Sequence, residues 1–99
     1  MAKRTPSRLE RRRQALSWVI SHLPNPDHFT THDVALMAEI LMSETWPPYL
    51  KIAWRTISTR EDTIGHAIGR HPDFEKHPDG IVNRQSRGTR IRSQTWQRR

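Results

Sequence analysis

The chain has 99 residues, 33% of them hydrophobic, and a formal net charge of +7. This length suits one small domain with a modest core and polar ends. The absence of cysteine excludes disulfide bonds, thiolate metal sites and cysteine catalysis. No apolar run approaches the roughly 20 residues that span a membrane, so we expect an intracellular chain without a membrane partner.

The positive charge lies at the two ends of the chain. Residues 1–13 hold six basic and one acidic side chain, and residues 84–99 hold six basic and no acidic ones. Residues 14–83 hold five basic and nine acidic side chains. Fourteen of the seventeen basic residues are arginine, whose guanidinium group bonds phosphates and guanine edges in pairs. This distribution predicts a polyanionic partner that the two ends straddle.

The chain begins with a predicted flexible basic arm, residues 1–6. Ser7 and Glu10 have the spacing of a capping box, which predicts a helix that runs to about Leu23, where two prolines follow. Trp18 falls on the polar side of this helix, where an exposed indole is unusual. We expect the C-terminal tail to cover it, with a dimer contact through this face as the alternative.

A buried helix is predicted next. Phe29 and Thr30 form a short extended piece, and Thr30 with Asp33 repeats the capping pattern. Nearly every residue from 34 to 42 is apolar, which leaves no solvent face of normal width. We therefore expect this helix to be covered by its neighbours on all sides.

In the segment Ser43–Arg55, two prolines interrupt regular secondary structure, and residues Tyr49 to Arg55 can then form two turns of helix. Leu50 and Trp54 would lie together at positions i and i+4. The aromatic residues of this segment are predicted to be core or cap residues, with stacking against bases as the alternative. They are Trp46, Tyr49 and Trp54.

The segment Ile57–Arg70 predicts an amphipathic helix, with Ser58 and Glu61 as its capping box. Its apolar side consists of Ile57, Ile64, Ala67 and Ile68. The side chains on its other side are short and polar, which suits either base reading in a major groove or an ordinary solvated face. That side consists of Thr59, Asp62, Thr63, His66 and Arg70. Two glycines inside the helix, Gly65 and Gly69, predict a close approach by another backbone, of protein or nucleic acid.

After a turn at Pro78-Asp79-Gly80, the closing segment predicts a β-hairpin. Its strands would be residues 81–84 and 89–96, joined by a four-residue loop at 85–88. Simple alternation places Trp96 on the arginine side of the second strand. We expect Trp96 to fold back on Trp18 instead, so that each indole covers the other.

Two stretches resemble winged-helix DNA-binding domains. The stretch Phe29-Thr30-Thr31-His32-Asp33-Val34-Ala35 is similar to the entry to the second helix of that family. The stretch Thr56-Ile57-Ser58-Thr59, followed by Ile64 and Ile68, is similar to its turn and recognition helix. The resemblance implies a mainly α fold with a small β-hairpin (α+β), as a single domain over residues 7–97. Three to four helices would precede a two-stranded wing at about 81–96.

The connection at Ser43–Arg55 departs from the family, because a helix-turn-helix uses a turn of three or four residues. One interpretation places an extra helix there, packed directly before the recognition helix. Which helix supports the recognition helix is left open.

The resemblance implies a double-stranded DNA-binding protein that acts by occupancy, as a small transcription regulator or as a packaging protein of chromatin or the nucleoid. Base contacts would come from Thr59, Arg60, Asp62, Thr63, His66 and Arg70. Phosphate contacts would come from Arg11, Arg12, Arg13, Arg84, Arg87, Arg90 and Arg92. A carboxylate in a phosphate-lined groove repels unless it accepts a hydrogen bond, so Asp62 favours sequence-specific reading.

No catalytic constellation, cofactor motif or small-molecule site is predicted. His28 and His32 are four residues apart, but the cap at Thr30 places His28 outside the helix, so we expect no metal site there. Two other classes of function stay open. An RNA-binding or ribosome-associated module would use the same arginines with aromatic stacking. A protein-interaction adaptor would use exposed tryptophans, and a homodimer could form through the Trp18 face.

Overall fold

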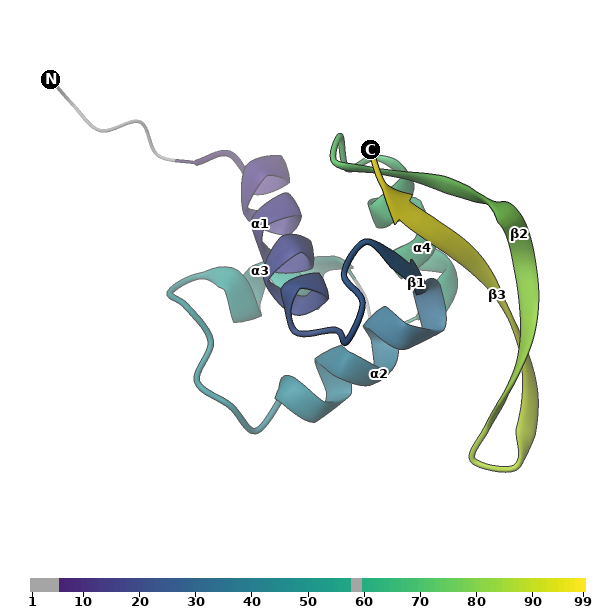
Figure 1. The fold of residues 1–99 in the computed structure, drawn as a ribbon. Helices are drawn as coiled ribbons and strands as arrows, with labels where there is room; N and C mark the ends of the chain where they lie inside the picture. The colour runs from purple at the N-terminus through teal and green to yellow at the C-terminus, as the bar shows by residue number, and fades with distance from the viewer. Residues whose placement is uncertain (1–5, 58–59) are drawn as a thin grey trace, which may run out of the picture.

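The computed structural model describes residues 6–57 and 60–99. These residues form an α+β domain with four helices and a three-stranded antiparallel sheet in the order β1–β3–β2. The helices gather on one side of the long β2–β3 hairpin, which curves past α4 and α2 (Figure 1). The elements are α1 (Arg8–Ser21), β1 (His28–Thr30), α2 (Thr31–Leu41), α3 (Leu50–Ile57), α4 (Glu61–Gly69), β2 (Phe74–Ser86) and β3 (Thr89–Arg98).

The first two predicted helix starts are confirmed. The Ser7 hydroxyl accepts a hydrogen bond from the Glu10 amide at 3.1 Å at the start of α1. At the start of α2, the Thr30 hydroxyl accepts from the Asp33 amide at 3.1 Å, and the Asp33 carboxylate accepts from the Thr30 amide at 2.9 Å. Each bond satisfies an amide that has no partner within its helix, which is why these polar residues set the helix boundaries.

One apolar core joins the helices to the sheet. The predicted inner side of α4 is confirmed, because Ile57, Ile64 and Ile68 are buried and Ala67 is half-buried. These side chains meet the apolar sides of α1 and α2 and the sheet residues nearest the helices. The other large buried residues include Leu16, Val19, Ile20, Val34, Phe29, Phe74 and Trp96.

The segment between α2 and α4 contains the predicted extra helix, α3. Leu50 and Trp54 are buried on its inner side, as expected, and Trp46 is also buried. Tyr49 is an exception to the predicted core role, because it is 66% exposed. The prediction that α2 is covered on all sides is also wrong, since Ile40 near its end is 64% exposed.

The tryptophans pair differently from the prediction. Trp18 contacts Trp46, with ring centroids 4.4 Å apart, and is half-buried. Trp96 instead donates a hydrogen bond from its indole nitrogen to the Thr31 hydroxyl at 2.8 Å. The predicted Trp18–Trp96 pair is therefore wrong, because the insertion before α3 supplies the covering indole.

The glycines of α4 let side chains of this same chain come close. A Cβ atom at Gly65 would lie 3.6 Å from the Thr31 hydroxyl oxygen, and one at Gly69 would lie 3.4 Å from the Trp96 ring. Within the described residues the close neighbours of these glycines are thus the side chains of Thr31 and Trp96, and not the second protein backbone that was predicted; the approach of a nucleic acid stays a prediction.

The C-terminal hairpin is longer than predicted. Strand β2 begins at Phe74, and the expected turn at residues 78–80 lies inside it as a bulge between Lys76 and Ile81. The predicted four-residue loop is a two-residue turn, because Ser86 already pairs with Thr89. Both turn residues have positive φ angles, as a tight hairpin turn of type I′ requires.

Candidate nucleic-acid interface

The helix proposed for base reading, α4, begins at Glu61, with Arg60 at the N-cap position and no side-chain capping bond. The predicted capping box of Ser58 and Glu61 is therefore wrong, and Ser58 itself lies outside the described residues. Glu61 is the first helical residue, and its carboxylate bonds the imidazole of His32 on α2. This contact joins the start of α4 to the start of α2 inside the domain.

The outward side of α4 is polar, as predicted. Asp62, His66 and Arg70 are exposed and Thr63 is half-buried, while Thr59 lies outside the described residues. These side chains form a short hydrophilic surface along the helix.

Asp62 has partners within the domain. Its carboxylate accepts a hydrogen bond from the Thr63 amide at 2.9 Å and lies 3.7 Å from the Arg60 guanidinium. A negative charge near a helix N-terminus is favourable, because the amides there carry partial positive charge. Local structure thus explains Asp62 without a base contact, which weakens the inference that Asp62 indicates sequence-specific reading.

The arginines of α1 are held against neighbouring helices. The Arg12 guanidinium donates to the Thr56 hydroxyl at 2.8 Å, and Arg13 donates to the backbone carbonyl of Arg70 at 3.5 Å. The Arg11 guanidinium lies 5.1 Å from the ring centroid of Tyr49. All three arginines are half-buried. Arg13 and Arg70 therefore meet at the C-terminal end of α4, where the helix dipole favours a positive charge.

The arginines of the hairpin lie on both of its faces. The four nearest its tip, Arg84, Arg87, Arg90 and Arg92, are exposed; Arg84 pairs with Ile91 in the strand register, whereas Arg92 pairs with Asn83. Because paired residues share a face and successive residues alternate, Arg90 and Arg92 lie on the face opposite to Arg84. Arg87 occupies the turn and bonds the Glu39 carboxylate of α2 at 3.1 Å. Sequence alternation alone could not show that this turn folds onto α2.

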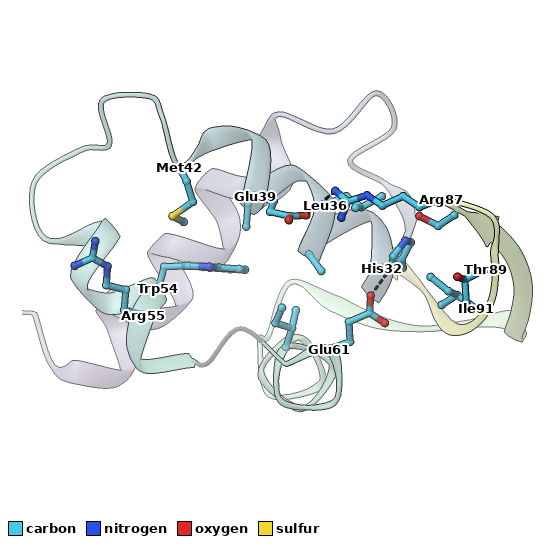
Figure 2. Close-up of a pocket in the computed structure, with 14 residues that line it drawn as sticks. His32, Leu36, Glu39, Met42, Trp54, Arg55, Glu61, Arg87, Thr89 and Ile91 are labelled. Atoms are coloured by element: carbon cyan, nitrogen blue, oxygen red, sulfur yellow. Dashed lines mark hydrogen bonds and ion pairs between the residues drawn. The ribbon is translucent and has the colours of Figure 1, made fainter.

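A hollow of about 670 Å³ lies between α2, α3, the first turns of α4 and the tip of the hairpin. Figure 2 shows Trp54 and Arg55 on one side of it and the hairpin residues Arg87, Thr89 and Ile91 on the other. The Glu39–Arg87 and His32–Glu61 contacts lie at its edge (Figure 2). No sequence pattern indicates this hollow, because its walls come from α2, α3, α4 and the hairpin.

A buried histidine, His71, lies at the C-terminal end of α4. His71, which follows α4, contacts the Ser17 hydroxyl at 2.8 Å and accepts from the Asp73 amide at 3.1 Å. Burial lowers the pKa of His71 below its ordinary 6.5, and the charge of Asp73 opposes this shift in part. His71 thus serves the packing of α1 against the end of α4.

The two histidines considered as a metal pair lie apart. His32 bonds Glu61, whereas His28 stacks on His77 with ring centroids 4.1 Å apart. The expectation that His28 and His32 do not form a site together therefore agrees with the geometry.

Comparison with known proteins gives no match to this chain among family models, curated proteins or solved structures. Within the part of the chain that the structure describes, no helix is long and apolar enough to cross a membrane.

Proposed function

We propose that this chain is a winged-helix protein that binds double-stranded DNA and acts by occupancy, as a transcription regulator or a packaging protein. In this proposal α4 is the recognition helix, and the β2–β3 hairpin is the wing. The order of helices and strands supports the proposal, since a helix with a polar outer side is followed directly by a long arginine-rich hairpin.

The observation that carries the proposal is the cationic end of α4. Arg13 of α1 donates to the backbone carbonyl of Arg70, so its guanidinium lies at the C-terminal end of α4, the end that also carries the exposed residues His66 and Arg70. The partial negative charge of the helix C-terminus accounts for Arg13 there, and the exposed side chain of Arg70 adds a cation that a polyanion would neutralise. His66 lies one turn before Arg70, so this end of α4 presents donors suited to base edges.

In this proposal, base contacts come from the exposed side of α4. Arg12 and Arg13 bind phosphate beside that helix, and Arg90 and Arg92 extend the contact along the wing. Their side chains face away from Arg84, which lines a hollow together with Met37 and Ile40 of α2.

The test compares two variants that remove the same single charge. We expect Arg70→Gln to flatten the difference between a preferred and a random duplex, because a side chain at a base edge carries sequence information. Lys76→Gln, at an exposed position near the start of β2 and not among the residues proposed to contact DNA, is the matched control. Fluorescence anisotropy with labelled duplexes measures both. Equal effects of the two variants would show that Arg70 contributes only charge.

The RNA-binding alternative depends on Tyr49, an exposed aromatic residue that lies beside Arg11. Stacking of unpaired bases needs such a ring. Competition between duplex DNA and single-stranded RNA for the same protein distinguishes the two classes, since DNA binding through α4 predicts that the duplex wins.

The adaptor alternative has less support. Trp46 and Trp54 are buried, and Trp46 covers much of Trp18. The tryptophans therefore offer little exposed surface to a partner protein, and the homodimer through the Trp18 face stays a prediction.

A further inference from the structure

Two imidazoles and a carboxylate form a cluster at the base of the hairpin, away from α4. His28 lies on β1, and His77 and Asp79 lie in the bulge of β2. The rings of His28 and His77 stack with planes 13° apart. His28 thus meets two residues that lie about 50 positions later in the chain, and the three residues present ligand atoms that all lie within 4.8 Å of one another.

The bulge is what brings these residues together. Strand β3 lies between β1 and β2, with His28 paired to Gln97 and Gln97 paired to Glu75. His77 is two residues after Glu75, so alternation places it on the same face as His28. Between Lys76 and Ile81, β2 has three more residues than β3 has opposite. The extra chain, with Gly80 at φ +63°, turns Asp79 back toward both imidazoles.

The distances within the cluster suit a metal ion. The Asp79 Oδ2 atom lies 3.7 Å from His28 Nε2 and 3.4 Å from His77 Nδ1. Ligands about 2.0–2.1 Å from a tetrahedral zinc ion lie about 3.3–3.5 Å from one another. Coordination would also need at least one imidazole to turn out of the stack, because the lone pair of each ring nitrogen lies in its ring plane and the two planes are only 13° apart.

We infer that His28, His77 and Asp79 bind a divalent transition metal of the zinc class, with water at the fourth position. Neutral imidazole and carboxylate are ligands that this class of metal accepts. The cluster is open to solvent, with 43%, 22% and 56% of the respective side chains exposed, so an ion can enter.

One ligand atom already has a partner within the bulge. The Asp79 amide donates a hydrogen bond to His77 Nδ1 at 3.0 Å. Metal binding would exchange that bond for coordination. The bound ion would join β1 to the bulge across β3, which fixes the base of the hairpin without any contact to α4.

Cobalt(II) provides a direct test with the full chain prepared without a histidine tag. Tetrahedral coordination gives cobalt strong visible absorption bands, and zinc should displace the cobalt at one equivalent per chain. Zinc calorimetry then compares the wild type with His28→Gln, His77→Gln and Asp79→Asn. We expect each variant to lose about tenfold or more in zinc affinity, at least the effect of removing an outer partner of a metal ligand.

The matched control is His66→Gln, which removes an exposed imidazole from α4 and should leave zinc affinity unchanged. Asp79→Asn keeps both imidazoles, so it tests the site even where a histidine variant fails to fold. The inference is overturned if zinc binds without a defined stoichiometry, or if Asp79→Asn and His66→Gln change the affinity equally. Neither result bears on DNA binding, which is measured separately.

Discussion

At the scale of single residues, buried polar groups determine how α4 is fixed in the domain. The Trp96 indole and the Thr31 hydroxyl bond each other inside the core, beside the two glycines of α4. Glycine costs a helix about 1 kcal/mol relative to alanine. A Cβ atom would lie 3.6 Å from Thr31 of α2 at Gly65 and 3.4 Å from the Trp96 ring of β3 at Gly69, which are ordinary contact distances, so packing by itself does not require glycine at either position.

His71 should make stability depend on pH. It is 4% exposed, and burial lowers its pKa in the folded state. Between that value and 6.5 the unfolded chain binds more protons than the folded chain, so the free energy of unfolding should fall as pH drops below 6.5. It should level off below the folded pKa. Above 6.5 this residue should contribute no pH dependence.

Urea unfolding between pH 8 and pH 5 measures this effect in the wild type and in His71→Gln. The variant should show a shallower loss of stability, because glutamine does not titrate. His66→Gln removes an exposed imidazole and should keep the wild-type slope. A His71→Gln slope as steep as that of the wild type would place the titrating group elsewhere.

At the scale of elements, sequence patterns correctly predicted the features that residues close together in the chain determine. Polar residues at positions 7 and 30 set two helix starts, and the apolar spacing of residues 57–68 gave the buried side of α4. The start of α4 was missed because Glu61 binds His32, a partner 29 residues away that no capping pattern reveals. Trp96 was misplaced for the same reason, since its hydrogen-bond partner Thr31 is distant in sequence.

The same limit applies to the candidate site. Sequence periodicity placed Asp62, His66 and Arg70 on the exposed side of α4. It could not show that Arg13 binds the end of α4, or that Arg87 folds onto α2, because both contacts depend on tertiary packing.

The turn of the hairpin allows a test at this scale. Arg87 has φ +54° and precedes Gly88 at φ +77°. Left-handed backbone costs most side chains about 1–2 kcal/mol, whereas asparagine adopts it readily. We therefore expect Arg87→Asn to be more stable than Arg87→Ala by about 1 kcal/mol. Both variants lose the exposed pair with Glu39, so thermal or urea unfolding isolates the backbone effect. Equal stabilities would contradict the two-residue turn.

At the scale of the whole molecule, charge is divided between the two ends of the chain, and the fold decides which charges act together. Of the α1 arginines, Arg13 bonds the end of α4 and Arg12 bonds α3, while the hairpin carries its arginines on two faces. If the protein contacts five to nine phosphates of a duplex, a plot of log affinity against log salt should have a slope of about −4 to −8. The two faces of the hairpin should contribute unequally to this slope.

Two double variants, each of which removes two positive charges, test whether the two faces of the hairpin contribute unequally to the salt slope. The variant Arg90→Gln/Arg92→Gln removes two positive charges from the hairpin face opposite to Arg84. The slope should become shallower by about 2, since each phosphate contact contributes about 0.9. Arg84→Gln/Arg87→Gln should change the slope less, because Arg84 lines a hollow with residues of α2 and Arg87 is neutralised by Glu39. Anisotropy titrations of a random duplex across a salt series measure both. A larger change in the second variant would mean that the hairpin turns its α2 side to the DNA, so that Arg87 leaves Glu39 on binding.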